Sequence, residues 1–360
     1  MNKKLPLMLL VALLSGCQAH YTHYDNEKYI STIETSNLSD FNICVFNDVH
    51  LSILSDVDYE TSYYDKVLKA KTGSYPDLLI INGDLFMDGN KEVVNRFFNY
   101  LDTTGVKYCF NYGNHDLQGQ YSNQYINNNL KKRSSSLLKN PKNDDVYGDS
   151  NYVVNIKVGG TVKWQLYVID SNTYDGVNYD VVHDDQIAWY VRQIQGANGL
   201  SSSDTLIDNS VDIIPSLVFM HIPFEEFYEA WEEHDFKKSG NENSSIWYMG
   251  EYVSCGGKDN NFYETMHQMK STKGVIVAHD HINLTDWSYD KIGTGDSSFP
   301  IRLIYGMKTG QGIYHDKRIM GANFYTLKED KTFSVTRMVV PYEGESYVLT
   351  DDMLTNLAGE

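Results

Sequence analysis

Five short apolar runs, each followed by residues of the types that bind metal ions, constrain the fold of this chain more than any other feature of its sequence. The runs are Ile43–Phe46, Leu78–Ile81, Val106–Phe110, Leu217–Met220 and Val275–Ala278. The residues that follow them are, in the same order, Asp48 and His50, Asp84, Asn114 with His115 and Asp116, His221, and His279 with His281. Because sites in open α/β sheets form where the carboxyl ends of strands meet, we expect these side chains to lie close together.

Helical patterns between the runs indicate the α/β class. Between the second and third runs, four apolar side chains recur at the spacing of one helix face, and Gly105 ends the pattern. Alternating strands and helices predict βαβ units on a largely parallel sheet. Further along, Gly159-Gly160 between two strand-like segments predicts a hairpin, and residues 301–340 alternate in several short strands. We therefore predict one α/β domain with a second, more antiparallel sheet.

Two stretches fit this alternation poorly, and we expect both to be insertions. Residues 117–150 are polar, whereas residues 223–262 are rich in aromatic and acidic side chains. Long insertions in compact domains are usually functional lids or disordered loops, and the aromatic content of the second stretch favours an ordered lid. The predicted domain covers residues 41–345, and residues 346–360 form a C-terminal tail.

The charge of the chain limits the partners that it can attract. It has 48 acidic and 30 basic side chains, which gives a formal net charge of −18. This balance argues against a nucleic-acid backbone or an anionic lipid surface as the main partner. A small phosphorylated substrate remains compatible with it, because bound metal ions reverse the sign of the local field.

The first residues resemble an export signal. Lys3 and Lys4 precede the apolar run Leu5–Leu14, which is too short to span a bilayer but suits the core of a signal peptide at residues 1–16. The segment Leu14–Cys17 resembles the bacterial lipobox, in which Cys17 would carry the lipid; the alternative is an ordinary secretory signal cut near Ala19. Both predict an exported protein. Residues 17–40 then form a polar tether, and membrane contact occurs only through the lipid anchor.

The candidate ligands suit two metal ions better than one. Asp48, Asp84, Asn114 and four histidines make seven groups, more than one tetrahedral ion uses. Imidazole, carboxylate and amide together fit Fe, Mn or Zn. Two ions that share a carboxylate, for which Asp84 is the natural candidate, form the clamp used for in-line displacement at phosphorus. Each motif alone is weak evidence; the ordered set is what carries the prediction.

This ordered set resembles the calcineurin-like metallophosphoesterase superfamily. The matching pieces are Asp48-x-His50, Gly83-Asp84, Gly113-Asn114-His115-Asp116, His221 and Ala278-His279-Asp280-His281, with alanine where the family usually has glycine. Segments 219–227, 279–283 and 305–310 are similar to a branch related to purple acid phosphatases, which includes the fungal dosage-dependent cell-cycle-regulator phosphatase. Met87 stands where the purple enzymes carry a tyrosine ligand, and those enzymes lack a histidine at position 50. A purple tyrosinate–iron site is therefore not expected.

The resemblance implies an α/β/β/α sandwich of two mixed sheets flanked by helices, and a role for each residue of the set. One ion is expected on Asp48, His50 and His281, the other on Asn114, His221 and His279, with Asp84 as the bridge. His115 would neutralise charge at phosphorus or protonate the leaving oxygen, with Asp116 accepting a hydrogen bond from it.

The activity that the resemblance implies is hydrolysis of phosphate monoesters by attack of a metal-bound hydroxide, and the export signal predicts that it takes place outside the cytoplasm. Two alternatives stay open. One is a phosphodiesterase acting on a cyclic nucleotide or a lipid headgroup, and the other is a surface binding protein that keeps the fold without catalysis.

Overall fold

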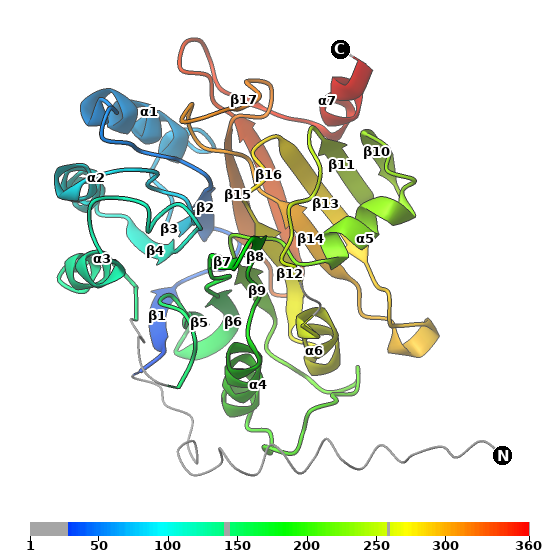
Figure 1. Cartoon of the computed structure of the whole chain (residues 1–360). Coiled ribbons are helices and arrows are strands. Elements are labelled where there is room, and N and C mark those ends of the chain that lie inside the picture. The colour runs from blue at the N-terminus through cyan, green and yellow to red at the C-terminus, as the bar shows by residue number, and fades with distance from the viewer. Residues whose placement is uncertain (1–27, 140–144, 258–259, 360) are drawn as a thin grey trace.

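Two large mixed sheets lie between two sets of helices in the computed structural model, which describes residues 28–139, 145–257 and 260–359 (Figure 1). One sheet has six strands and the other has nine. A third, two-stranded sheet is the hairpin of β7 (Tyr174–Asp175) and β8 (Asn178–Tyr179). The predicted fold class, an α/β/β/α sandwich of mixed sheets, is confirmed.

The six-stranded sheet contains the predicted βαβ units. Its order is β17-β16-β15-β2-β3-β4, in which β2, β3 and β4 are parallel and the other pairings are antiparallel. Helices α1 and α2 connect the parallel strands, and Gly105 ends α2 in a left-handed conformation, as expected. The bounds are β2 (Asn42–Phe46), α1 (Val57–Lys69), β3 (Leu78–Asn82), α2 (Lys91–Thr104), β4 (Lys107–Asn111), β15 (Gly321–Leu327), β16 (Phe333–Val339) and β17 (Tyr347–Val348).

The nine-stranded sheet contains the remaining predicted strands and the predicted hairpin, β5–β6. Its order is β1-β5-β6-β9-β12-β14-β13-β11-β10, with β6, β9, β12 and β14 parallel to one another. The strand bounds are β1 (Ile30–Thr35), β5 (Tyr152–Val158), β6 (Thr161–Val168), β9 (Ser216–Phe219), β10 (Ser239–Glu242), β11 (Ser245–Met249), β12 (Thr272–Val277), β13 (Asn283–Tyr289) and β14 (Ile301–Tyr305). Its helices are α4 (Asp184–Asn198) and α6 (Phe262–Met269).

Alternate side chains of the central strands divide the core into two layers. On β9, Leu217 and Phe219 belong to the apolar cluster that also contains β2 and β3 side chains, so they fill the space between the sheets. Val218 belongs to a second cluster with Trp189 and Tyr190 of α4. Because both faces of these strands are covered, they read as continuous apolar runs in the sequence.

The predicted polar tether at residues 17–40 is wrong over part of its length. Residues Ile30–Thr35 form β1, which pairs in parallel with β5 at the edge of the nine-stranded sheet. Tyr29 is fully buried just before this strand and Ile30 nearly so, which explains why the segment docks despite its polar composition. The predicted signal at residues 1–16, Cys17 and the residues up to 27 lie outside the described residues.

The predicted insertion at residues 223–262 extends the nine-stranded sheet instead of forming a lid. After helix α5 (Glu226–Glu233), strands β10 and β11 add to the sheet beside β13. Trp247 on β11 is fully buried. Several aromatic side chains of this stretch, among them Phe227 and Trp247, therefore belong to the core.

The other two outlying segments also contain regular structure. In the 117–150 stretch, helix α3 (Asn123–Leu130) packs through Ile126 and Leu130. In the predicted tail, helix α7 (Asp351–Asn356) buries Leu354 in a small apolar cluster with side chains of β11. Short 3-10 helices lie at Gly295–Ser297 and Leu357–Gly359.

The two buried cysteines of the six-stranded sheet are not bonded to each other. Cys44 on β2 and Cys109 on β4 are free, and β3 separates their strands. Among the described residues, no helix has both the length and the apolar character that a membrane span requires.

Candidate metal centre

The predicted ligands lie together at the carboxyl ends of five strands, between the two sheets. Asp48 and His50 follow β2, Asp84 follows β3, and Asn114 follows β4 in the six-stranded sheet. His221 follows β9, and His279 and His281 follow β12 in the nine-stranded sheet. The charged and imidazole ligands form two groups of three, each of which offers ligand atoms within 4.8 Å of one another.

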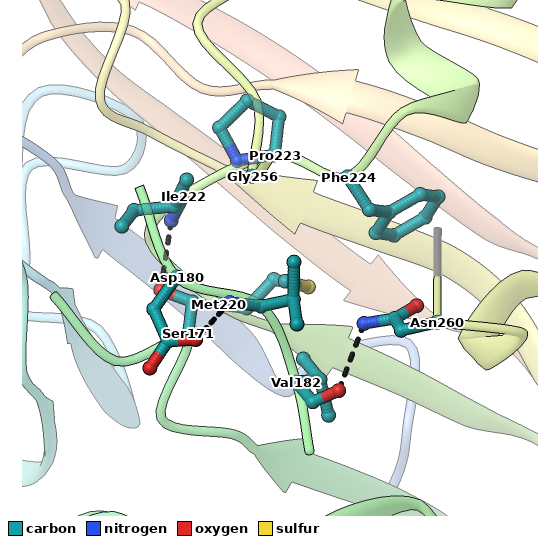
Figure 2. A pocket seen from close by; sticks show the side chains of 10 residues that line it. Ser171, Asp180, Val182, Met220, Ile222, Pro223, Phe224, Gly256 and Asn260 are labelled. Carbon is teal, nitrogen blue, oxygen red and sulfur yellow. Dashed lines mark hydrogen bonds between the residues drawn. The ribbon is translucent and has the colours of Figure 1, made fainter. Parts of the chain in front are cut away.

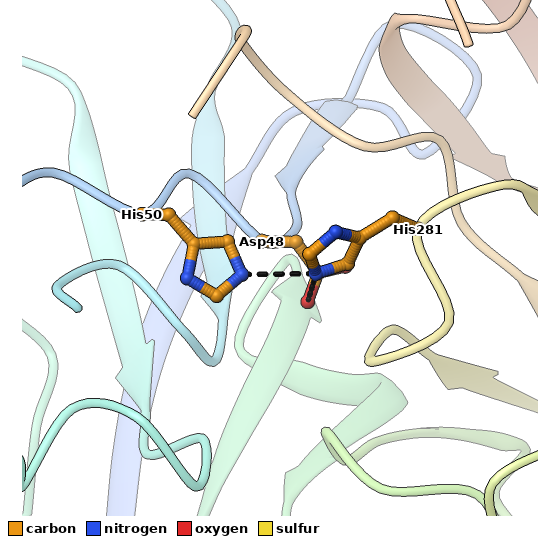
Figure 3. Close-up of side chains that lie close together, drawn as sticks. All are labelled: Asp48, His50 and His281. Carbon is orange, nitrogen blue, oxygen red and sulfur yellow. Dashed lines mark hydrogen bonds and ion pairs between the residues drawn. The ribbon is translucent and has the colours of Figure 1, made fainter. Parts of the chain in front are cut away.

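The first group, called cluster one, consists of Asp48, His50 and His281, all of them buried (Figure 3). Nε2 of His50 lies 2.9 Å from Nε2 of His281, and the latter atom lies 3.7 Å from Oδ1 of Asp48. Two imidazole nitrogens and a carboxylate oxygen thus converge on one point.

The second group, called cluster two, consists of Asp84, His221 and His279, which are also buried. Nε2 of His221 lies 3.2 Å from Oδ2 of Asp84. Asn114 adjoins this group, because the backbone N–H of the next residue, His115, donates to Oδ1 of Asp84 over 2.8 Å.

Asp84 faces both clusters. Its Oδ2 lies 3.2 Å from Nε2 of His221 in cluster two and 3.6 Å from Nε2 of His50 in cluster one. A carboxylate oxygen between two groups of ligands is the arrangement of a bridging ligand.

Unpaired polar atoms test whether these residues fit metal ions. Within the described part of the chain, Oδ1 of Asn114 and Nε2 of His279 are buried and have no hydrogen-bond partner, whereas Oδ2 of Asp84 and Nε2 of His221 contact each other at 3.2 Å. An unsatisfied buried polar atom costs about 1–3 kcal/mol. Such atoms, on residue types that suit Fe, Mn or Zn, would be satisfied by bound cations. The donor set therefore fits a metal centre.

Burial keeps most of the imidazoles in the neutral form that binds metal. It lowers the pKa of His279 and of His281 to about 3, and it lowers the pKa of His50 far below its usual range. His221 differs: burial would lower its pKa, but the Asp84 and Asp48 carboxylates outweigh that effect and raise it to about 9. Without metal, His221 therefore holds a proton where an ion would place its charge.

Several ligand residues have a backbone conformation that L-amino acids rarely adopt. The φ angles of Asp48, His50, Asp84 and His279 are 51°, 55°, 51° and 77°. Such backbone costs on the order of 1–3 kcal/mol per residue and persists only where neighbouring contacts hold it. Here the His50 N–H donates to the Asp84 carbonyl over 2.9 Å, and the His279 N–H donates to Oδ1 of Asp48 over 3.1 Å.

The glycines of the Gly-Asp and Gly-Asn motifs leave room for ligand side chains at the site. A Cβ atom at Gly83 would overlap the His221 ring, and one at Gly113 would overlap the Asp84 carboxylate. Gly83 also has a φ of 90°. These two positions require glycine because a ligand side chain occupies the space beside them.

The predicted hydrogen bond between His115 and Asp116 is wrong. Nδ1 of His115 lies 2.8 Å from Oε1 of Gln118 instead. The fully buried carboxylate of Asp116 accepts backbone N–H groups of Gly113, Asp84 and Phe86 at 2.8–2.9 Å. Asp116 is thus a positioning residue for the loop that carries Asp84. His115 is partly exposed, and its ring centroid lies 5.3 Å from that of His50.

Sequence reasoning missed Lys308, a buried side chain beside cluster one. Its Nζ donates to the backbone oxygen of Asp48, and burial lowers its pKa to about 8 although Asp48 and Asp84 oppose the shift. Lys308 follows β14, the strand next to β12. Its position after a strand could have indicated a site residue, but lysine is not a residue type that ordinarily binds metal ions.

Three buried asparagines that join the sheets beneath the site were also missed. Asn82 donates to the Met220 carbonyl over 3.0 Å, Asn111 donates to the Ile169 carbonyl over 3.0 Å, and Asn47 donates to the Met307 carbonyl over 3.0 Å. Each comes from the end of a parallel strand of the six-stranded sheet and reaches the end of a strand in the other sheet. They hold together the two halves of the ligand set.

Comparison with known proteins gives a family match and several weaker likenesses. The family model described as calcineurin-like phosphoesterase matches residues 41–283. A curated protein of Moraxella catarrhalis (strain BBH18), named probable cyclic nucleotide phosphodiesterase, is 34% identical over 84 residues, which is 23% of this chain and 30% of that relative's length.

Two solved structures show a distant likeness. A cold-active protein-tyrosine phosphatase of a Shewanella species is 12% identical, with 91% of this chain and 85% of that one aligned at a TM-score of 0.30. The sulfate thiohydrolase SoxB of Thermus thermophilus is 12% identical, with 89% and 58% aligned at a TM-score of 0.38. Scores of this size carry no inference about activity.

Proposed function

The chain belongs to the calcineurin-like phosphoesterase family, and from this membership we propose that it hydrolyses phosphate monoesters with two metal ions held by cluster one and cluster two. Membership implies a metal-dependent phosphoesterase. The observation that carries the proposal is the pair of buried clusters that face one shared carboxylate, that of Asp84.

The residues of the site would have separate roles in metal binding and in proton transfer. Asp48, His50 and His281 would hold one ion, Asn114, His221 and His279 the other, and Asp84 both. Bound ions of this kind supply a Lewis acid and lower the pKa of a bound water. His115 adjoins both clusters, since its N–H contacts Asp84 and its ring lies near His50. It would neutralise a phosphoryl oxygen or donate a proton to the leaving oxygen, with Gln118 orienting its ring.

One feature supports monoesters, and the metal stays open among Fe, Mn and Zn. Segments 219–227, 279–283 and 305–310 are similar to a branch made of phosphatases, the purple-acid-phosphatase-related branch that contains the fungal cell-cycle-regulator enzyme. A formal charge of −18 makes metal ions the means by which any phosphate ester, monoester or diester, is attracted.

Metal analysis together with ester hydrolysis tests the proposal. Protein purified without added metal is analysed for Fe, Mn and Zn, and phenyl phosphate and diphenyl phosphate are hydrolysed in parallel with added Mn. We expect close to two ions per chain and faster turnover of the monoester. The His115→Ala variant should keep both ions and lose about 10²–10⁴-fold in rate. If wild type and variant hold metal but neither hydrolyses any ester, the chain is a binding protein and the proposal fails.

A phosphodiesterase is the second candidate. The relative from Moraxella catarrhalis bears the name of a probable cyclic nucleotide phosphodiesterase, and it matches this chain over 84 residues. If diphenyl phosphate or a cyclic nucleotide is turned over tenfold faster than phenyl phosphate, this candidate replaces the first.

We propose further that the chain is exported and anchored by a lipid on Cys17. The support is the Lys3-Lys4 pair, the apolar run Leu5–Leu14 and the lipobox-like Leu14–Cys17. Expression in a bacterium fed labelled palmitate should label the wild type in the membrane fraction. The Cys17→Ala variant should lose the label; a label that persists contradicts the assignment to Cys17.

A further inference from the structure

We propose that the β7–β8 hairpin is a substrate wall whose tyrosines bind a planar, uncharged organic group attached to the phosphoryl group. This inference rests on the proposed function only in taking a phosphoryl compound as the ligand. It goes further in naming the chemistry of the rest of that ligand.

The two tyrosines of the hairpin extend directly from cluster two. The ring centroids of Tyr174 and Tyr179 lie 5.3 Å apart at 28°, which is a stacked pair. Tyr179 in turn meets the His279 ring with centroids 4.4 Å apart at 85°. The Tyr174 hydroxyl accepts a hydrogen bond from Nδ2 of Asn114 over 3.3 Å, which leaves Oδ1 of Asn114 as the unpaired ligand atom.

The hairpin is fixed at its base to the segment that carries His221. The Asp180 N–H donates to the Thr173 carbonyl over 3.2 Å, which closes the base. The Ile222 N–H donates to Oγ of Ser171 over 2.9 Å, just before the hairpin. Figure 2 shows these segments around a small pocket at the hairpin base, which contains none of the ligands of cluster one or cluster two. The wall therefore keeps a set position relative to cluster two.

An exposed tyrosine stands beside each cluster. Tyr174 is 46% exposed, although the hairpin is fastened and its hydroxyl reaches Asn114. Beside cluster one, Tyr314 is 49% exposed and stacks on His281, with centroids 4.3 Å apart at 28°. Aromatic faces left open next to a polar site stack planar groups, and they gain little from short alkyl groups.

Acidic side chains limit the charge of the group that the wall binds. Asp175 is exposed on the hairpin beside Tyr174, and Glu251 accepts a hydrogen bond from the Tyr314 hydroxyl over 2.8 Å. A second phosphate or carboxylate on the ligand would meet these carboxylates. The wall therefore suits an uncharged aromatic ring or base next to a single phosphoryl group.

Calorimetric titration of the metal-loaded protein with two non-hydrolysable phosphonates tests the proposal. Phenylphosphonate and methylphosphonate carry the same charged group, so the ratio of their affinities measures the organic part and is independent of leaving-group chemistry. We expect phenylphosphonate to bind about tenfold more tightly, the size of one aromatic stacking contact.

Variants test whether the hairpin causes the difference in affinity between the two phosphonates. Tyr174→Ala should bring the ratio close to one, whereas Tyr174→Phe, which keeps the ring, should preserve it. Tyr347→Ala, at a 40% exposed tyrosine on β17, is the matched control and should behave as wild type. A wild-type affinity ratio near one, or an unchanged ratio in Tyr174→Ala, overturns the proposal that the hairpin binds the organic group, while leaving the proposed function intact. If neither phosphonate binds, the proposed function fails with it.

Discussion

Cluster one and cluster two are built from the same residue types but differ in how their ligand atoms are satisfied. In cluster one, His50 and His281 have each other as partners, and the buried Lys308 places a positive charge against Asp48. In cluster two, Nε2 of His279 and Oδ1 of Asn114 are buried with no hydrogen-bond partner among the described residues, and Nε2 of His221 lies 3.2 Å from Oδ2 of Asp84. Unmet polar atoms favour an ion, whereas a nearby cation opposes it; an ion in cluster two can displace the proton of His221, but the charge of Lys308 stays beside cluster one. We therefore expect cluster two to bind its ion first and more tightly.

Loss of the Asp84 carboxylate should weaken metal binding at both clusters and so remove the difference between their affinities. In Asp84→Asn, both clusters lose the charge that faces them, so we expect the rate to fall on the order of 10³-fold and both ions to bind poorly. Metal content after gel filtration and the rate on phenyl phosphate measure the two effects. Asp88→Asn, an exposed acid in the same loop, is the control and should match wild type. An Asp84→Asn protein that still holds two ions would show that Asp84 is not the bridge.

Removal of one histidine from each cluster should expose the order of affinity. His281→Ala should retain one ion, in cluster two, against a chelator. His279→Ala should retain its remaining ion about 10–100-fold more weakly. Competition with a chromophoric chelator gives both affinities. Equal retention by the two variants would contradict the comparison.

The positions of the site residues could be predicted from the sequence where a ligand directly follows a strand. Asp48, Asp84 and His221 could be placed together because each directly follows a buried strand, and such ends converge. Residues that act through another residue could not be placed. Asp116 follows a histidine in the chain, yet it accepts hydrogen bonds from backbone N–H groups of the loop after β3. A motif of two adjacent residues does not show such contacts.

The fold, like the site, could be predicted from the sequence only in part. The buried parallel strands were predictable because both of their faces are covered, which makes their runs apolar. Strand β1 lies at a sheet edge, and only Ile30 among its six residues is an apolar side chain that is nearly fully buried, so its sequence reads as a polar tether. Strands β10 and β11 complete a sheet and carry no ligand, so nothing in their sequence distinguished them from a lid.

Asn114 gives a finer test of the difference between the clusters. In Asn114→Ala, cluster two loses one of its unpaired ligand atoms, and we expect its affinity to fall at least tenfold while cluster one is unchanged. Stepwise metal titration monitored by calorimetry separates the two events. A larger loss in cluster one would mean that Asn114 belongs there.

The smallest effects are expected from the asparagines that join the sheets. Asn82→Ala and Asn47→Ala each leave buried carbonyls without a donor, so we expect each to lower the free energy of unfolding by about 1–3 kcal/mol in chemical denaturation. The backbone oxygen of Asn82 also lies 3.1 Å from Nδ1 of His221, whereas Asn47 contacts the segment of Lys308. Asn82→Ala should therefore weaken cluster two and Asn47→Ala cluster one, with the exposed Asn37→Ala as control. If both weaken the same cluster, the asparagines are not specific to one side.

The mixed origin of each cluster has a consequence for how the chain folds. Asp48 and His50 come from one sheet and His281 from the other, and Asp84 and Asn114 face His221 and His279 in the same way. A folding intermediate with only one sheet formed lacks at least one ligand of each cluster. We therefore expect completion of the metal centre and docking of the sheets to be one late event, across sequence separations of up to 233 residues. Metal added during refolding should leave the early phases unchanged and slow only the reverse step, unfolding.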